Sequence, residues 1–154
     1  MEFQFLQICN PIRCCGLPRC PPQHQDCEAL LQYVIVKSIV AILVGIGVLV
    51  LNNGLYNGNR ILSEQYIREM LTEREESYGY LWWIYKKNST IKIIRKEYST
   101  GKYDAYCMNG VGGSLVTVIP EIDTVICMTC SLVYNPKPRM ELINNYLIPY
   151  IEKL

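Results

Sequence analysis

Apolar residues dominate residues 30–51, where only Gln32, Lys37 and Ser38 interrupt the run. No proline falls inside it, so we expect one continuous helix. At about 1.5 Å per residue, such a helix is about 33 Å long, enough to cross the hydrocarbon core of a membrane. A transmembrane anchor and a buried helix of a soluble domain both fit this pattern.

From Asn52 onward, the pattern is that of an ordinary α+β protein. Two apolar, β-branched runs at residues 114–119 and 124–131 predict strands, and residues 120–123 between them predict a hairpin loop. Apolar residues occupy both odd and even positions in the two runs. This indicates strands that are covered on both faces.

Further elements flank these strands. Ser63 is a favourable N-cap, and it precedes a predicted helix with Ile67, Met70 and Leu71 on one face. The aromatic-rich residues 78–85 predict another strand. The fold class predicted is therefore α+β, an antiparallel sheet flanked by helices.

The C-terminal tail is predicted to be helical. Pro138 suits the first turn, and Pro149 cannot donate to the carbonyl of Asn145, so we expect a kink there. One apolar stripe of this helix is predicted to contain Met140, Ile143, Tyr146, Leu147, Tyr150, Ile151 and Leu154.

The head of the chain, residues 1–29, is rich in cysteine and proline. Its potential metal ligands are Cys14, Cys15, Cys20, His24 and Cys27. Their spacing fits no paired Cys-x-x-Cys pattern, so we predict an irregular segment without metal or cofactor rather than a zinc site. A disulfide cluster is a further alternative and needs an oxidising compartment. The net charge of +1 and the lack of a basic run give no reason to expect nucleic acid as a partner.

Three segments resemble the C-terminal part of serine hydrolases of the β-lactamase family, which includes class C β-lactamases and penicillin-binding proteins. Residues 45–64 are similar to a family helix that ends in a Leu-Asn-x-Gly turn. Residues 78–84 are similar to a Tyr-Gly-x-Gly-Trp-Trp strand, and residues 109–121 to a glycine-rich strand with its Pro-Glu turn. The resemblance spans residues 46–154 and implies the C-terminal half of the β-lactamase/transpeptidase-like fold.

The resemblance also implies a substrate site for a small acyl compound. The family's Lys-Thr-Gly or His-x-Gly motif aligns with Met108, Asn109 and Gly110, and Val111 N–H takes the position of an oxyanion donor. Gly112 and Gly113 would let substrate pass close to the backbone. The alternative for these small residues is a tight strand start. Met108 replaces the basic residue, which puts recognition of a carboxylate-bearing β-lactam in doubt.

The family's nucleophile is a serine in a Ser-x-x-Lys motif on a helix, where positions i and i+3 share a face. Ser89–Lys92 matches by letter but lies in a predicted strand, and Ser99–Lys102 lies in a predicted turn. Tyr-x-Asn and Ser-x-Asn motifs are absent. We therefore expect no catalytic residues and a fragment that is inactive by itself. The alternative is a small membrane-anchored structural or binding protein that uses the half-fold as a scaffold.

Two remaining features argue against a redox or metal site and against a Ser-His-Asp triad. Cys127 and Cys130 are three residues apart on a predicted strand, so they face opposite ways and are expected to be core residues. His24 lies outside the matched region, so no Ser-His-Asp triad is available.

The family-like pattern begins near Ile46, inside a predicted helix, although domain boundaries usually fall in exposed linkers. This predicts a truncated or frameshifted product. It also predicts an open sheet edge that promotes self-association.

Overall fold

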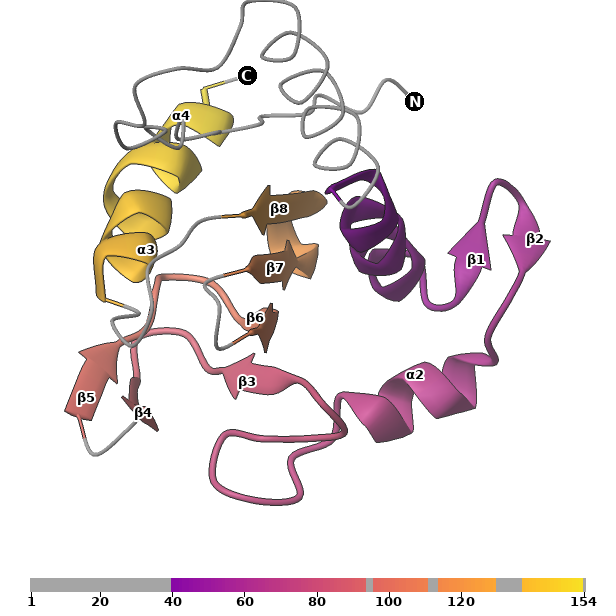
Figure 1. Cartoon of the computed structure of the whole chain (residues 1–154), viewed down its shortest axis with the longest axis horizontal. Coiled ribbons are helices and arrows are strands. Elements are labelled where there is room, and N and C mark those ends of the chain that lie inside the picture. Colours follow the sequence, from indigo (N-terminus) through magenta and orange to yellow (C-terminus); the bar gives the residue numbers. More distant parts are fainter. Residues whose placement is uncertain (1–39, 94–95, 111–113, 130–136, 154) are drawn as a thin grey trace, which may run out of the picture.

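The computed structural model describes residues 40–93, 96–110, 114–129 and 137–153. These residues form an α+β fold in which antiparallel strands are flanked by helices, as predicted (Figure 1). The elements are a helix over residues 40–51, β1 (Leu55–Tyr56), β2 (Asn59–Arg60), α2 (Glu64–Met70), β3 (Trp83–Tyr85), β4 (Thr90–Ile93), β5 (Lys96–Ser99), β6 (Ala105–Asn109), β7 (Leu115–Ile119), the 3-10 turn η1 (Pro120–Ile122), β8 (Thr124–Met128), α3 (Lys137–Leu142), the π-helical segment η2 (Ile143–Leu147) and α4 (Ile148–Ile151).

The central sheet has four antiparallel strands in the order β3-β6-β7-β8. Its register places Cys107 between Trp83 on β3 and Thr117 on β7. The predicted hairpin loop is confirmed, since η1 joins β7 to β8. β1–β2 and β4–β5 form separate two-stranded antiparallel hairpins.

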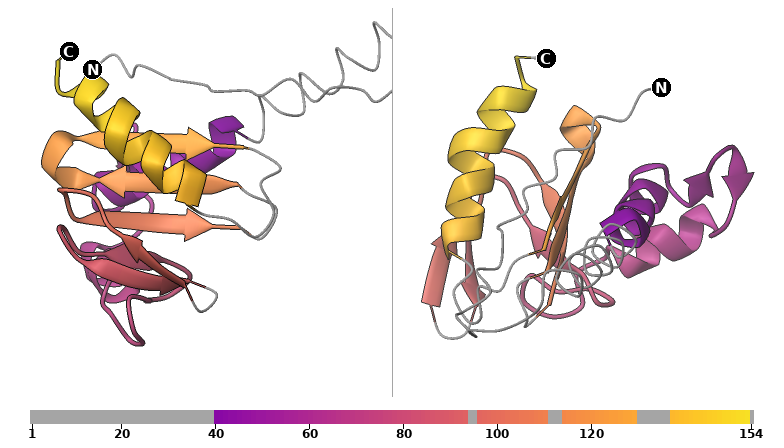
Figure 2. Two further views of the ribbon diagram at one scale, coloured as in Figure 1. Left: turned by 90° about the vertical axis from the view of Figure 1, so that its left-hand side faces the viewer. Right: turned by 45° about the horizontal axis from the view of Figure 1, so that its top comes forward.

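β7 is buried along its whole length, which confirms that the sheet is covered on both faces. Leu115 and Ile119 belong to one hydrophobic cluster, whereas Val116 and Val118 belong to another. The two clusters lie on opposite faces because successive side chains of a strand point to opposite sides. The sheet is therefore the middle of three layers, with helices on either side (Figure 2).

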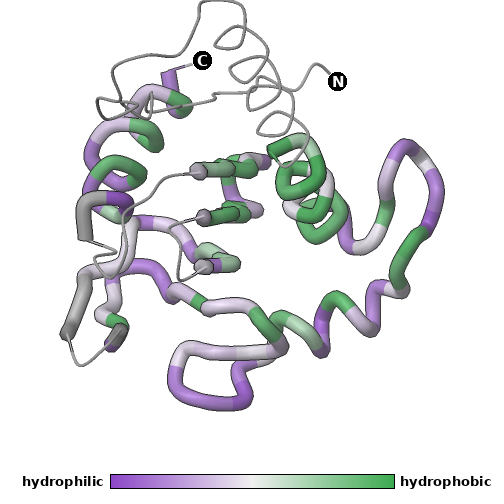
Figure 3. Tube along the Cα trace, viewed as in Figure 1, coloured by the Kyte–Doolittle hydropathy of each residue, from purple (hydrophilic) through white to green (hydrophobic). Residues whose placement is uncertain are grey.

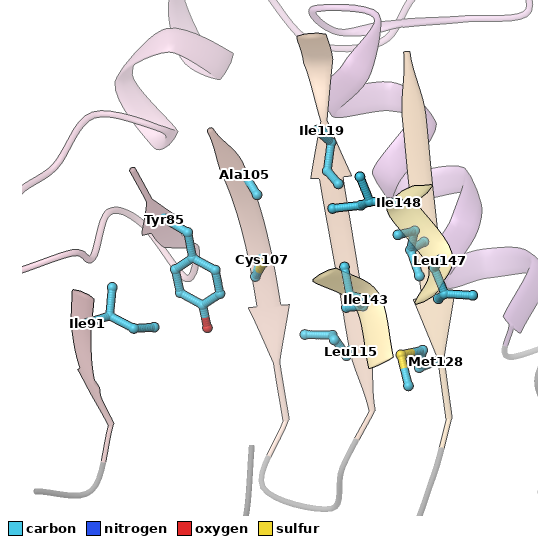
Figure 4. Packing of buried hydrophobic residues seen from close by; sticks show 11 residues of the cluster. Tyr85, Ile91, Ala105, Cys107, Leu115, Ile119, Met128, Ile143, Leu147 and Ile148 are labelled. Carbon is cyan, nitrogen blue, oxygen red and sulfur yellow. The ribbon is translucent and has the colours of Figure 1, made fainter. Parts of the chain in front are cut away.

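The C-terminal helical segments cover one face. Their buried residues Ile143, Leu147 and Ile148 pack against the sheet (Figure 4). The helix of residues 40–51 and α2 cover the other face, where Val50, Ile67 and Met70 are buried. We call the face covered by the C-terminal helical segments the C-terminal face of the sheet. The face covered by the helix of residues 40–51 and α2 is the N-terminal face.

The helix of residues 40–51 is packed tightly against the N-terminal face. A Cβ on Gly47 would lie 2.5 Å from Val125 Cγ1 and 3.0 Å from Val116 Cγ1. Its apolar composition is visible in Figure 3. α2 begins as predicted, because Ser63 Oγ accepts a hydrogen bond from Tyr66 N–H at 3.1 Å.

The prediction of one apolar helix over residues 30–51 is not borne out. Within the described part of the chain, this helix covers residues 40–51, and residues 30–39 lie outside the described residues. No helix of the described ranges is long and apolar enough to span a bilayer. The cysteine-rich residues 1–29, with their zinc and disulfide alternatives, also lie outside the described residues.

The strand predicted over residues 78–85 is shorter than expected, because β3 covers only Trp83–Tyr85. Ser77 and Leu81 have positive φ angles of 58° and 64°, which bend the chain before β3. Tyr78 still forms isolated bridges to Glu75 and Trp83. The preceding residues are therefore a tight loop against the sheet edge.

The C-terminal helix departs from the predicted stripe through a π-helical turn. A π turn contains one residue more than an α turn, so side chains after it change face. Tyr146 and Tyr150 are exposed, contrary to the prediction, whereas Ile148 is buried in their place. The kink expected near Asn145 stays a prediction; η2 contains this residue and ends just before α4.

Candidate functional site

Met108, Asn109 and Gly110 lie at the end of β6 and just beyond it. Their side chains divide between the two faces of the sheet. Met108 packs against the hydrophobic cluster of the N-terminal face, whereas Asn109 lines a cavity on the C-terminal face. The other predicted site residues, Val111, Gly112 and Gly113, lie outside the described residues.

The described residues leave space around Gly110. Its N–H donates to Ser114 O at 2.9 Å, which closes the turn into β7. Among the described residues, a Cβ placed on Gly110 would meet no atom closer than the same oxygen, at 3.6 Å. Close packing in the described structure therefore does not require glycine at this position, unlike at several other glycines of the chain.

Two other positions do favour glycine, and both lie in the loop before β3. A Cβ on Gly79 would lie 2.5 Å from Met70 O and 2.9 Å from Thr72 O, both backbone atoms. Leu81 has a φ of 64° and its side chain is 79% exposed. A left-handed conformation costs a residue with a Cβ about 1–2 kcal/mol, so glycine would be preferred where Leu81 stands.

Ser89 and Lys92 do not form a nucleophile pair. Lys92 lies in β4, as the strand-favouring residues predicted, and Ser89 directly precedes that strand. Ser89 N–H donates to Thr100 Oγ1 at 2.8 Å, and Ser89 Oγ donates to Thr90 O at 3.5 Å. The arrangement joins a hairpin and does not bring a lysine amine to the serine hydroxyl.

In the segment Ser99–Lys102, the last three residues each make a contact that stabilises the fold. Thr100 is buried, and its Oγ1 joins the hairpin by donating to Lys86 O at 2.5 Å. Gly101 lies against Asn144 of the C-terminal helix. Lys102 is bonded through Nζ to Glu152 Oε1. The lysine is thereby held at the helix end and not at Ser99.

The buried cysteines are core residues. Cys107 and Cys127 are unpaired thiols on different strands of the central sheet. Burial raises the pKa of Cys107 to about 12, although its hydrogen bond with Thr117 opposes the shift. Burial also raises the pKa of Cys127, and Cys130 lies outside the described residues. The described residues contain no group of three potential metal ligands of the His, Cys, Asp or Glu types.

A cavity that sequence patterns did not predict lies between the C-terminal face and the C-terminal helix. The cavity is partly open to solvent. Residues from β3, β6, β7 and the C-terminal helix line it, and the helix side includes Arg139 and Asn144. Such a space arises from packing between distant segments, so no local sequence signal could have revealed it.

The described geometry contains no assembled catalytic group of serine and lysine. Comparison of the chain with models of protein families, and with curated proteins, found no match.

Proposed function

We propose that this chain supplies the sheet portion of an acyl-transferring serine hydrolase related to β-lactamases and penicillin-binding proteins. In this proposal, the chain contributes a substrate-facing strand end at Met108–Gly110 and does not contribute the nucleophile. The fold is that of the C-terminal half of the β-lactamase/transpeptidase-like fold.

The main support for the proposal is the backbone conformation of the loop before β3. The family's Tyr-Gly-x-Gly-Trp-Trp motif has glycine at the two positions occupied here by Gly79 and Leu81. The first position excludes a Cβ by contact with Met70 O, and the second has a positive φ. The physical demands of the loop therefore match the glycine pattern of the family motif, including at the position where this chain departs from it.

The surroundings of Gly110 add support. Glycine is present there although a Cβ would have room, so its role lies outside the packing of the described residues. Close approach of an acyl substrate to the backbone is a reason for glycine that does not depend on packing. In this proposal, Val111 N–H then donates to the developing oxyanion.

The proposal requires a second polypeptide segment, because Ser89 Oγ and Ser99 Oγ donate to backbone carbonyls and Tyr-x-Asn is absent from the sequence. Such a segment would supply the Ser-x-x-Lys helix. The test is co-expression of the chain with polypeptides encoded beside its gene. The co-purified assembly is then assayed with p-nitrophenyl butyrate and with a chromogenic cephalosporin.

We expect the chain alone to hydrolyse neither substrate above the buffer rate, and the assembly to hydrolyse at least one. Gly110→Val should lower the assembly's kcat/KM by about tenfold or more, because the added side chain would block close approach of the substrate to the backbone. Ser89→Ala and Ser99→Ala are the matched controls and should leave the rate unchanged. Hydrolysis by the chain alone that disappears in either serine variant would contradict the proposal, as would the absence of any co-purifying polypeptide with a Ser-x-x-Lys motif.

A second candidate function, a membrane-associated scaffold, has one observation in its favour. The outer side of the helix of residues 40–51 exposes Ile42 and Ile46, with Ile42 64% exposed. Tyr56 lies beside Gly45 of the same helix and is also exposed. Fractionation of cells that express the chain separates the two candidates, since only the scaffold predicts recovery with membranes in the absence of a partner polypeptide.

A further inference from the structure

The cavity on the C-terminal face has mostly apolar walls. Ala105 and Leu115 contribute from the strands, and Ile143 and Ile148 contribute from the helical side. Figure 4 shows these side chains between the sheet and the C-terminal helix. Because the cavity is partly open to solvent, a compact apolar molecule has access to these walls.

The side chain of Tyr85 brings a hydroxyl group to this cavity. Tyr85 lies at the end of β3, lines the cavity and is only 8% exposed. Figure 4 shows its ring between Ile91 and Cys107. Among the described residues, no group forms a hydrogen bond with its hydroxyl. A buried hydroxyl without a partner is unfavourable, so a ligand atom that pairs with it would be bound more tightly.

Several other polar side chains of the lining already interact within the chain. The Tyr103 hydroxyl donates to Glu152 Oε1. Cys107 Sγ donates to Thr117 Oγ1 at 3.4 Å. Arg139 has an interaction of its own within the chain, so its charge does not call for an anionic ligand. Tyr85 is therefore the group of the lining that we expect to orient a bound molecule.

The cavity disfavours negative charge. Burial raises the pKa of Tyr85 far above its usual value, and Arg139 opposes this shift without cancelling it. Burial also raises the pKa of Cys107 to about 12, so both groups keep their protons near neutral pH. Surroundings that penalise a phenolate and a thiolate also penalise a ligand anion. The ligand that fits is therefore neutral, and Tyr85 keeps the hydrogen that it would donate.

We propose that this cavity binds a compact neutral carbonyl compound, whose apolar body lies between Leu115 and Ile143 and whose oxygen accepts a hydrogen bond from the Tyr85 hydroxyl. A carbonyl oxygen only accepts, so the ligand brings no donor of its own that would stay unpaired between apolar walls. Apolar walls with a single orienting polar group are typical of small-molecule sites. The inference does not depend on the proposed acyl-hydrolase function, because these three residues lie outside Met108–Gly110 and binding needs no second polypeptide.

The test is isothermal titration calorimetry on the full chain with acetophenone, α-methylstyrene and benzoate. The first two have nearly the same shape, but α-methylstyrene has a CH2 group in place of the carbonyl oxygen. We expect acetophenone to bind about three- to tenfold more tightly than α-methylstyrene, as one hydrogen bond between neutral groups allows. Benzoate should bind most weakly. Equal affinities of the first two probes, tighter binding of benzoate, or no binding of acetophenone would overturn the proposal with the unaltered chain alone.

Three variants then locate the site. Tyr85→Phe removes only the hydroxyl, so acetophenone should bind no better than α-methylstyrene, whose affinity should not change. Tyr103→Phe is the matched control, because this tyrosine lines the same cavity but its hydroxyl bonds to Glu152, and the preference for acetophenone should remain. Ile143→Trp fills the cavity and should weaken binding of both probes. A preference that survives Tyr85→Phe, or binding unaffected by Ile143→Trp, in variants with a cooperative thermal melt, would place the ligand elsewhere and overturn the proposal.

Discussion

Gly79 lies so close to the end of α2 that a Cβ on it would be 2.5 Å from Met70 O. That oxygen also accepts a hydrogen bond from Tyr80 N–H at 3.0 Å, so it cannot move away without loss of this bond. The contact fixes the loop before β3 against the helix on the N-terminal face. The contact between these two residues thereby determines how α2 joins the sheet.

The first prediction follows from this contact. Gly79→Ala should lower the free energy of unfolding by about 1–3 kcal/mol, because the added methyl group forces backbone atoms apart. Urea denaturation measures the change. Gly110→Ala is the matched control and should change stability by less than about 0.5 kcal/mol, since its Cβ would meet no atom of the described ranges closer than 3.6 Å. Equal losses in the two variants would contradict this account of Gly79.

The second prediction concerns Leu81, whose φ of 64° is unfavourable for a residue with a Cβ. Leu81→Gly should raise the free energy of unfolding by about 0.5–1 kcal/mol, since relief of the strain exceeds the entropy that glycine loses on folding. Little burial is lost because the side chain is 79% exposed. Leu81→Ala keeps the Cβ and should show no gain. A glycine variant less stable than the alanine variant would rule out this conformation.

The third prediction concerns the pH dependence of the cluster at the helix end, where Lys102 and Tyr103 both bond to Glu152 Oε1. Hydrogen bonds from Lys102 and then from Tyr103 lower the pKa of Glu152. The hydrogen bond with Glu152 raises the pKa of Lys102. The stability from this cluster is therefore present above the ordinary pKa of glutamate and is lost as pH falls through the lowered value. At the alkaline end, it is lost as pH rises through the raised pKa of the lysine.

Thermal melting of the parent chain and of Glu152→Gln, measured from acid to alkaline pH, checks this dependence. The difference in melting temperature should be largest near neutral pH and should shrink toward both extremes. Lys92→Gln provides a control that changes a lysine outside the cluster. A difference that stays constant with pH would show that Glu152 contributes through packing and not through its charge.

The fourth prediction concerns thiol reactivity. Because burial raises the pKa of Cys107 to about 12, iodoacetamide should not label it in the folded chain near neutral pH. Labelling should appear when urea unfolds the chain, and peptide mass spectrometry distinguishes Cys107 from the other cysteines. Rapid labelling of Cys107 without denaturant would mean that β6 is exposed to solvent.

Patterns of apolar residues predicted the central part of the fold well. β7 and β8 follow from runs of β-branched residues, and η1 follows from Pro120 between them. Ser63 marked the start of α2 because capping is a local interaction. These elements are decided by residues close together in the sequence, so the sequence alone was sufficient.

The features that were missed depend on distant contacts. The loop before β3 is bent at Ser77 and Leu81, neither of which is a usual residue for positive φ. The cavity is lined by residues of separate elements, such as Asn109 of β6 and Arg139 of α3, and no sequence periodicity predicts such packing. In the predicted site, the side chains of Met108 and Asn109 point to opposite faces of the sheet. Their alignment with a single family motif did not predict this difference.

The π-helical segment η2 marks the place where the C-terminal helix can lose one residue without losing its packing. A π turn contains one residue more than an α turn, so the five residues of η2 turn the chain about as far as four residues of an α-helix. Deletion of one residue from Ile143–Leu147 would therefore restore regular α-helical bonding and leave Ile148 facing the sheet. Deletion of one residue within α4 would instead turn the residues after it by about 100° around the helix axis.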